Sequence, residues 1–108
     1  MRKLSFVIIF VSFLFANGEV HKGQTYYYYL LKDHLGYDGS VFAKKHTDKQ
    51  WLKLFDNNAQ GLKKYLLSQN ESLHAFLQSK KFNKISPHLK AFVIQFASNK
   101  KNIPQCRE

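Results

Sequence analysis

The chain has 108 residues, of which 44% are hydrophobic, and it carries 17 lysines and arginines against 7 acidic residues. This length allows one domain and excludes a multidomain enzyme, and an aromatic content of 16% is too high for a disordered chain of this charge. The single cysteine excludes an internal disulfide, a zinc knuckle and an iron–sulfur cluster.

Residues 1–18 have the pattern of a secretory signal peptide. Arg2 and Lys3 form a basic start, twelve uncharged residues run from Leu4 to Phe15, and small residues close the segment. A helix of this length is about 18 Å long, too short for a hydrocarbon core of about 30 Å. We expect the segment to be removed, with an uncleaved anchor as the alternative, and the protein to be bacterial and either periplasmic or secreted.

The expected mature domain, residues 19–108, keeps 15 basic and 7 acidic residues, a net charge of +8. Its apolar residues recur at helical spacing and no alternating strand pattern is evident, which predicts an all-α fold with about five helices. The first helix is expected from Gln24 to Leu35 and should end at Gly36. The segment from Val41 to His46 is expected to be irregular.

Polar residues mark the start of each later helix. Thr47 and Gln50 form a capping box, and Asn57 or Asn58 and then Asn70 or Ser72 are the expected caps of two further short helices. The last helix is expected to begin with Ser86 as N-cap and Pro87 in its first turn, and a polar C-terminal tail follows. The apolar residues expected to face the core are Trp51, Leu54, Phe55, Ala59, Leu62, Tyr65, Leu66, Leu73, Phe76, Leu77, Leu89, Phe92, Val93 and Phe96.

Four short motifs follow one another in the first half of the chain. They are Gly23-x-x-Tyr26, Gly36-Tyr37-Asp38-Gly39, Phe42-Ala43-Lys44-Lys45-His46-Thr47 and Trp51-Leu52-Lys53-Leu54-Phe55. Together, with a weaker match from Leu89 to Ala97, they resemble a small class I cytochrome c. The resemblance implies a cytochrome c-like helical scaffold.

The haem-binding motif of that family is missing. When Gly36-Tyr37-Asp38-Gly39 is aligned with its G-x-D-G, Leu31 and His34 stand where the family has cysteines, and Leu35 stands where it has the proximal histidine. Covalent haem needs those cysteines and that imidazole, so covalent haem is excluded. We expect Leu31 and Leu35 to fill the space that haem would take, and aromatic residues such as Tyr27 and Trp51 to complete the core.

Two further motifs lie at the ends of the domain, Gly23-Gln24-Thr25-Tyr26-Tyr27 and Asn102-Ile103-Pro104-Gln105-Cys106. They resemble the ends of a second family, the small secreted proteins of Helicobacter- and Campylobacter-like bacteria. An odd cysteine in an oxidising compartment is a candidate for an intermolecular disulfide. For Cys106 we expect either such a disulfide, to a second copy or a partner, or an exposed free thiol.

No complete catalytic constellation is present, so we expect a non-enzymatic accessory or interaction protein, associated with a respiratory or envelope complex. The candidate contact surface consists of Tyr26, Tyr28, Tyr37, Lys44 and Lys45. Two alternatives remain. One is an electron-transfer or cofactor-binding protein that holds haem or a metal non-covalently through histidine, with His34 and His46 as weak candidate ligands. The other is a cationic protein that binds anionic membrane surfaces. The single arginine of the mature chain disfavours sequence-specific nucleic-acid binding.

Overall fold

A computed structural model describes residues 19–101, in which there are six α-helices, one 3-10 helix and no strand. The all-α prediction is confirmed, with one helix more than the expected number. The predicted signal peptide, most of the polar tail and Cys106 lie outside the described residues.

The N-terminal part of the domain contains three helical segments. Residues 19–30 form the first helix, and after a turn at Leu31 the chain continues in α2 (Lys32–Leu35). Gly36 ends α2 with φ of 88°, the left-handed conformation that favours glycine, as the sequence predicts. The next helix, α3 (Gly39–Ala43), corrects the expectation of an irregular segment from residue 41. It forms because Phe42 and Ala43 become completely buried.

Helix α4 (Asp48–Gln69) begins with the predicted capping box. The Gln50 amide donates to the Thr47 hydroxyl over 3.2 Å, and the Thr47 amide donates to Oε1 of Gln50 over 2.9 Å. The helix is interrupted at the predicted asparagines, since Asn57, Asn58 and Ala59 have φ between 54° and 61°. Asparagine tolerates this left-handed conformation better than other residues with a Cβ, and the methyl group of Ala59 is buried there.

The C-terminal part comprises η1 (Glu71–Leu73), α5 (His74–Leu77) and α6 (Lys80–Gln95). Asn70 caps η1, as one of the two predicted alternatives, by accepting the Ser72 amide proton over 2.9 Å.

The predicted start of the last helix at Ser86 is wrong. Ser79 is the N-cap of α6, accepting the Phe82 amide over 3.3 Å, and Pro87 lies inside the helix. An interior proline costs about 3 kcal/mol. The additional turns bury Phe82 and Ile85, and each such side chain contributes about 1.5–3 kcal/mol.

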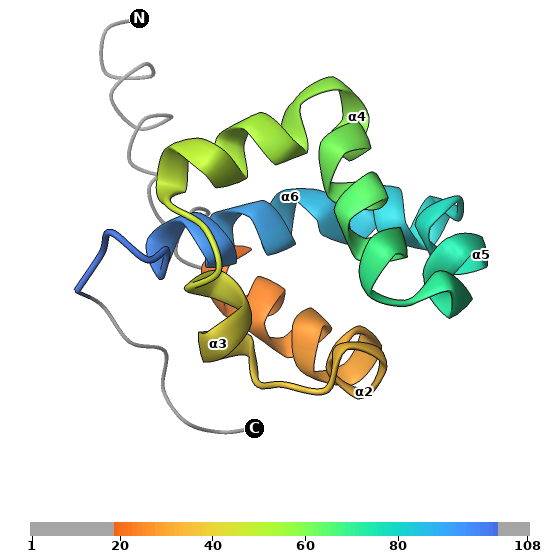
Figure 1. Ribbon diagram of the computed structural model, residues 1–108, viewed down its shortest axis with the longest axis horizontal. Helices are drawn as coiled ribbons and strands as arrows, with labels where there is room; N and C mark the ends of the chain where they lie inside the picture. Colours follow the sequence, from red (N-terminus) through yellow and green to blue (C-terminus); the bar gives the residue numbers. More distant parts are fainter. Residues whose placement is uncertain (1–18, 102–108) are drawn as a thin grey trace, which may run out of the picture.

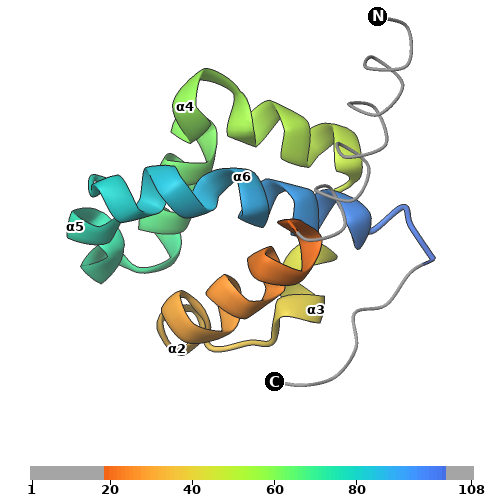
Figure 2. The ribbon, with the colours of Figure 1, turned by 180° about the vertical axis from the view of Figure 1, so that it is seen from behind.

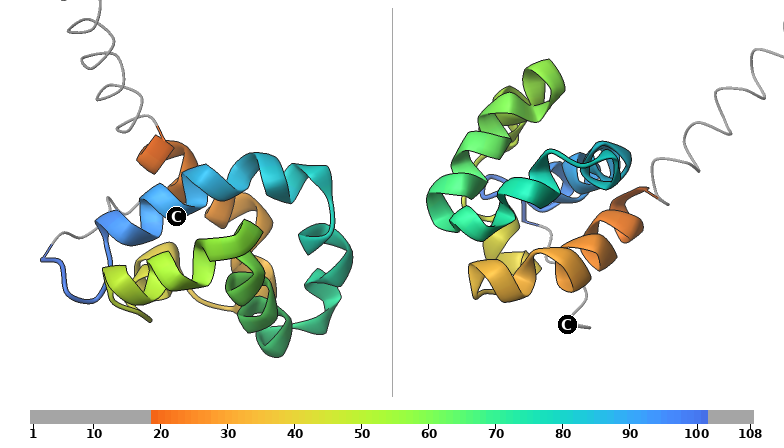
Figure 3. Two further views of the ribbon diagram at one scale, coloured as in Figure 1. Left: turned by 90° about the horizontal axis from the view of Figure 1, so that it is seen from above. Right: turned by 90° about the vertical axis from the view of Figure 1, so that its right-hand side faces the viewer.

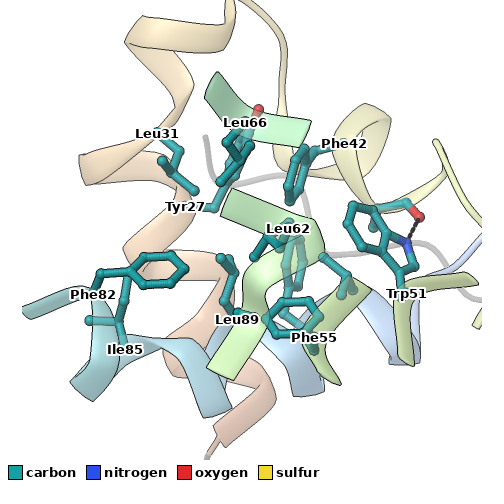
Figure 4. Close-up of a cluster of buried hydrophobic side chains, with 14 of the residues drawn as sticks. Tyr27, Leu31, Phe42, Trp51, Phe55, Leu62, Leu66, Phe82, Ile85 and Leu89 are labelled. Carbon is teal, nitrogen blue, oxygen red and sulfur yellow. Dashed lines mark hydrogen bonds between the residues drawn. The ribbon is translucent and has the colours of Figure 1, made fainter. Parts of the chain in front are cut away.

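Helix α6 is the centre of the domain. It crosses the middle of the molecule, with α4 on one side and the first helix, α2 and α3 on the other (Figures 1 and 2). Viewed from above, α5 and the second part of α4 close one end of this arrangement (Figure 3). Side chains from all of these layers meet in a single core (Figure 4). Its buried members are Tyr27, Leu31, Phe42, Ala43, Trp51, Phe55, Ala59, Leu62, Leu66, Leu73, Leu77, Phe82, Ile85, Leu89, Phe92, Val93 and Ala97.

The first helix and α6 make backbone contact at Gly23. A Cβ atom built on Gly23 would lie 2.1 Å from the carbonyl oxygen of His88 and 2.7 Å from Cβ of Phe92. Glycine is therefore required here by the close approach of the two helices. This crossing fixes the orientation of the face that the first helix turns to solvent.

Candidate functional site

A column of aromatic rings links the first helix to α3 and α4. Tyr27 stacks on Phe42 with ring centroids 4.7 Å apart, and Phe42 packs against Trp51 at 5.0 Å. The Trp51 indole N–H donates to the Ala43 carbonyl over 2.9 Å (Figure 4). Leu31 is buried beside this column. Tyr27, Leu31 and Trp51 thus occupy the core positions that the sequence predicts for them.

His46 lies at the end of this column, between Trp51 and Tyr65. Its ring is edge-on to both, with centroid distances of 4.7 and 5.1 Å, and its Nε2 atom is buried without a hydrogen-bond partner. Burial lowers the pKa of His46 below its ordinary 6.5; the charge of Lys45 acts in the same direction and the side chain of Gln50 opposes it. The neutral ring is therefore the form that the fold accommodates.

We expect the domain to lose stability below about pH 6.5. Because the pKa of His46 is lower in the folded state, the unfolded chain binds more protons than the folded chain between pH 6.5 and the folded-state pKa. The stability contributed by neutral His46 is therefore complete above pH 6.5 and is lost as the pH falls through this range. Urea denaturation from pH 7.5 to 5 should show this loss. His46→Phe, which keeps an aromatic ring between Trp51 and Tyr65, should reduce the pH dependence. An equal pH dependence in wild type and His46→Phe would contradict the assignment.

Tyr37 is partly enclosed by the domain and is less available than the sequence suggested. Burial raises its pKa to about 12, and the neighbouring Tyr65 hydroxyl adds to this shift, although the pair falls short of hydrogen-bond geometry. The main-chain carbonyl of Tyr37 accepts the Tyr27 hydroxyl over 2.6 Å. The exposed Lys45 lies over the Tyr37 ring, with Nζ 4.7 Å from the centroid.

Lys44 holds the segment that follows α6. Its Nζ atom donates to the carbonyls of Ala97 and Lys100, each over 3.1 Å. The Ser98 amide donates to the His46 carbonyl over 3.0 Å at the same junction. Lys44 is therefore engaged within the domain, in contacts across more than fifty residues that no local pattern predicts.

An aromatic hollow lies where the first helix meets α2. We call it the tyrosine hollow; it has a volume of about 300 Å³ and is lined by Tyr28, Tyr29, Lys32 and Asp33. Tyr29 is 74% exposed and Tyr28 is 36% exposed. Their rings meet edge to face at 4.9 Å. Lys32 lies 4.9 Å above the Tyr28 ring and forms a 2.9 Å ion pair with Asp38.

The other predicted tyrosine, Tyr26, faces inward. It is partly buried, and its ring lies 5.8 Å from that of His88 on α6. Of the predicted contact residues, Tyr28 alone lines the tyrosine hollow. Tyr29, its most exposed member, is not among the predicted contact residues. Helical spacing contained the signal, because Tyr29 is about 200° around the helix from Tyr27, which the spacing places inside.

The two histidines considered as ligands have different neighbours. His34 is exposed, and its Nδ1 lies 3.3 Å from the Ser72 hydroxyl, while its carbonyl accepts from Nδ2 of Asn70 over 2.8 Å. His46 instead packs between aromatic rings. Within residues 19–101, no group of three or more histidine, cysteine, aspartate or glutamate side chains is arranged to hold a metal ion.

The comparisons with known proteins give no relative: no family model, curated protein or solved structure matches the chain. The resemblance to cytochromes c therefore stays a prediction from sequence motifs. No helix in the described part of the chain is both long enough and apolar enough to cross a membrane.

Proposed function

We propose that this chain is an exported, non-enzymatic interaction protein that binds another protein of the bacterial envelope through the tyrosine hollow. The observation that carries the proposal is the exposed pair Tyr28 and Tyr29, whose rings are already arranged edge to face. Tyrosine is enriched in protein interfaces, because it offers a large contact area at a small cost in side-chain entropy.

Charged side chains at the tyrosine hollow can recognise polar groups of a partner. Lys32 is held by Asp38 and by the Tyr28 ring, so its ammonium loses little freedom on binding. Asp33 lines the same hollow and is exposed. A protein partner can complement both signs of charge, whereas an anionic bilayer would repel the Asp33 carboxylate. These features favour a protein partner at this surface.

The proposal also gives this accessory protein a cytochrome c-like scaffold without covalent haem. It is supported by the sequence motifs and by the side chains at the haem-motif positions: Leu31 is buried and Leu35 packs against the core. Aromatic side chains, including Phe55 and Phe92, add to this core as expected. Export is supported by the sequence pattern of residues 1–18.

A photocrosslinking experiment tests the proposed surface. A benzoylphenylalanine in place of Tyr29, in the full chain expressed in its native host, should give one discrete heavier adduct. The same group in place of Leu52, which is 45% exposed on α4, should not give that adduct. Tyr28→Ala should reduce the adduct at position 29 about tenfold, because interface aromatics commonly contribute more than 1 kcal/mol.

Two outcomes would overturn this proposal. The same adduct in equal yield from positions 29 and 52 would indicate collision rather than a defined surface. An adduct at position 29 that is insensitive to Tyr28→Ala, in a variant with an unchanged circular dichroism spectrum, would show that the paired rings do not form the contact.

A further inference from the structure

The positive charge of the domain is concentrated in its second half. Residues 19–56 contain six lysines and five acidic residues, a net charge of +1. Residues 57–101 contain eight lysines and one acidic residue, Glu71, a net charge of +7. A charge asymmetry of this size between two halves of a chain is typical of proteins with an anionic partner.

Five of these lysines come from elements that gather at one end of the molecule. The second part of α4, α5 and the beginning of α6 form this end in Figures 1 and 2 and in the left view of Figure 3. Lys63 of α4 reaches across to α6, with its Nζ atom 5.6 Å from the centre of the Phe82 ring. We define the lysine end as Lys63, Lys64, Lys80, Lys81 and Lys84.

Ion pairs within the domain do not neutralise the lysine end. In the described part of the chain, the ion pairs join Lys32 to Asp38 and Lys100 to Asp48. Apart from the half-buried Lys63, the members of the lysine end are exposed. Their charges are therefore directed to solvent and to whatever approaches this end.

The position of three of these lysines on α6 is unfavourable for the fold. Lys80 and Lys81 occupy the first turn, Lys84 follows one turn later, and the first turn contains no acidic residue. Cations at a helix N-terminus oppose the helix dipole. A stabilising role within the domain therefore does not account for them, whereas an external anionic partner does.

We propose that the lysine end docks on the surface of an anionic phospholipid bilayer. Lysine ammonium groups are attracted to negative headgroups without any requirement for a shaped pocket. None of the large hydrophobic side chains exposed in the described residues lies between residues 57 and 101, so this end lacks the apolar anchor of a typical protein interface. The contact is peripheral and electrostatic, and it is separate from the tyrosine hollow.

Vesicle binding of the full chain tests this inference. The probe is a vesicle with three parts phosphatidylcholine to one part phosphatidylglycerol, in low salt. Lys80→Gln/Lys81→Gln/Lys84→Gln should weaken binding about a hundredfold, since each lysine near such a surface contributes about fivefold. The matched control Lys22→Gln/Lys49→Gln/Lys53→Gln removes the same charge from exposed positions elsewhere and should weaken binding much less. All variants keep residues 1–18, so any contribution from that segment is common to them.

If these lysines instead stabilised the domain, the variants would give different results. The α6 triple variant should be at least as stable as wild type in urea, because it removes cations from a helix N-terminus; its loss of binding then reflects the surface and not unfolding. Equal losses in the two triple variants, or a difference between them that is undiminished in high salt or on pure phosphatidylcholine vesicles, would overturn the lysine end as a membrane-docking surface. None of these variants alters the tyrosine hollow, so the crosslinking test fails or succeeds independently.

Discussion

Gly23→Ala should destabilise the domain by about 3 kcal/mol, the upper part of the range for inserting a methyl group into a packed contact. The obstacle is main chain: a Cβ atom at this position would meet the carbonyl carbon and oxygen of His88 at 2.7 and 2.1 Å. A backbone carbonyl cannot rotate away as a side chain does. The first helix would have to move off α6, and the burial of Tyr27 and Leu31 would be lost with it.

The sign of this effect makes the experiment decisive. Helix propensity alone predicts that glycine to alanine stabilises a helix by about 1 kcal/mol. Thr25→Ala, at an exposed position on the same helix, should show a small gain or no change in the free energy of unfolding. Urea denaturation followed by far-UV circular dichroism measures both variants. A Gly23→Ala protein as stable as wild type would refute the close crossing of the first helix and α6.

Local signals in the sequence were sufficient where the structure uses local contacts. The capping box of Thr47 and Gln50 joins residues three apart, and the stop at Gly36 depends on one φ angle. Both were predicted correctly because the neighbouring residues contain all the information. The inward direction of Tyr27 was also available from helical spacing, and Tyr29 then follows as the residue on the opposite side.

Tertiary contacts decided the features that the sequence did not reveal. Ser86 and Pro87 form a good local start signal, yet α6 begins two turns earlier because Phe82 and Ile85 find buried positions. Lys44 resembled a surface charge, but in the fold the segment after α6 places two carbonyls 3.1 Å from its Nζ atom. Such contacts depend on elements distant in sequence, which a single sequence does not place.

The lysine end falls between these cases. The charge excess of residues 57–101 can be counted in the sequence, but its meaning depends on α4 and α6 meeting, as Lys63 and Phe82 do. The same applies to the tyrosine hollow, where Lys32 is held by Asp38 across the turn at Gly36. For both surfaces the sequence shows which types of residue are present, but only the fold shows that they lie close together.

Trp51→Ala should have the largest effect on stability, a loss of about 4 kcal/mol. Trp51 is completely buried and contacts Phe42, His46 and Phe55, with ring centroids 5.0, 4.7 and 6.4 Å away. Truncation leaves a cavity and also deprives the buried Ala43 carbonyl of its indole donor. The free energy of unfolding of a small domain is about 5–15 kcal/mol in total, so the variant should have a much lower urea midpoint.

The adjacent residue provides the control for Trp51. Leu52 is 45% exposed, so Leu52→Ala should change the free energy of unfolding by about 0.5 kcal/mol or less. Trp51→Phe separates the effect of ring packing from that of the indole hydrogen bond, because it keeps an aromatic ring and removes only the indole N–H and part of the volume. Its loss of stability should lie between those of the two alanine variants. Equal stability of Trp51→Ala and Leu52→Ala would contradict the aromatic column as the core of the domain. An intermediate Trp51→Phe variant would instead show that ring packing and the bond to Ala43 both hold α3 against α4.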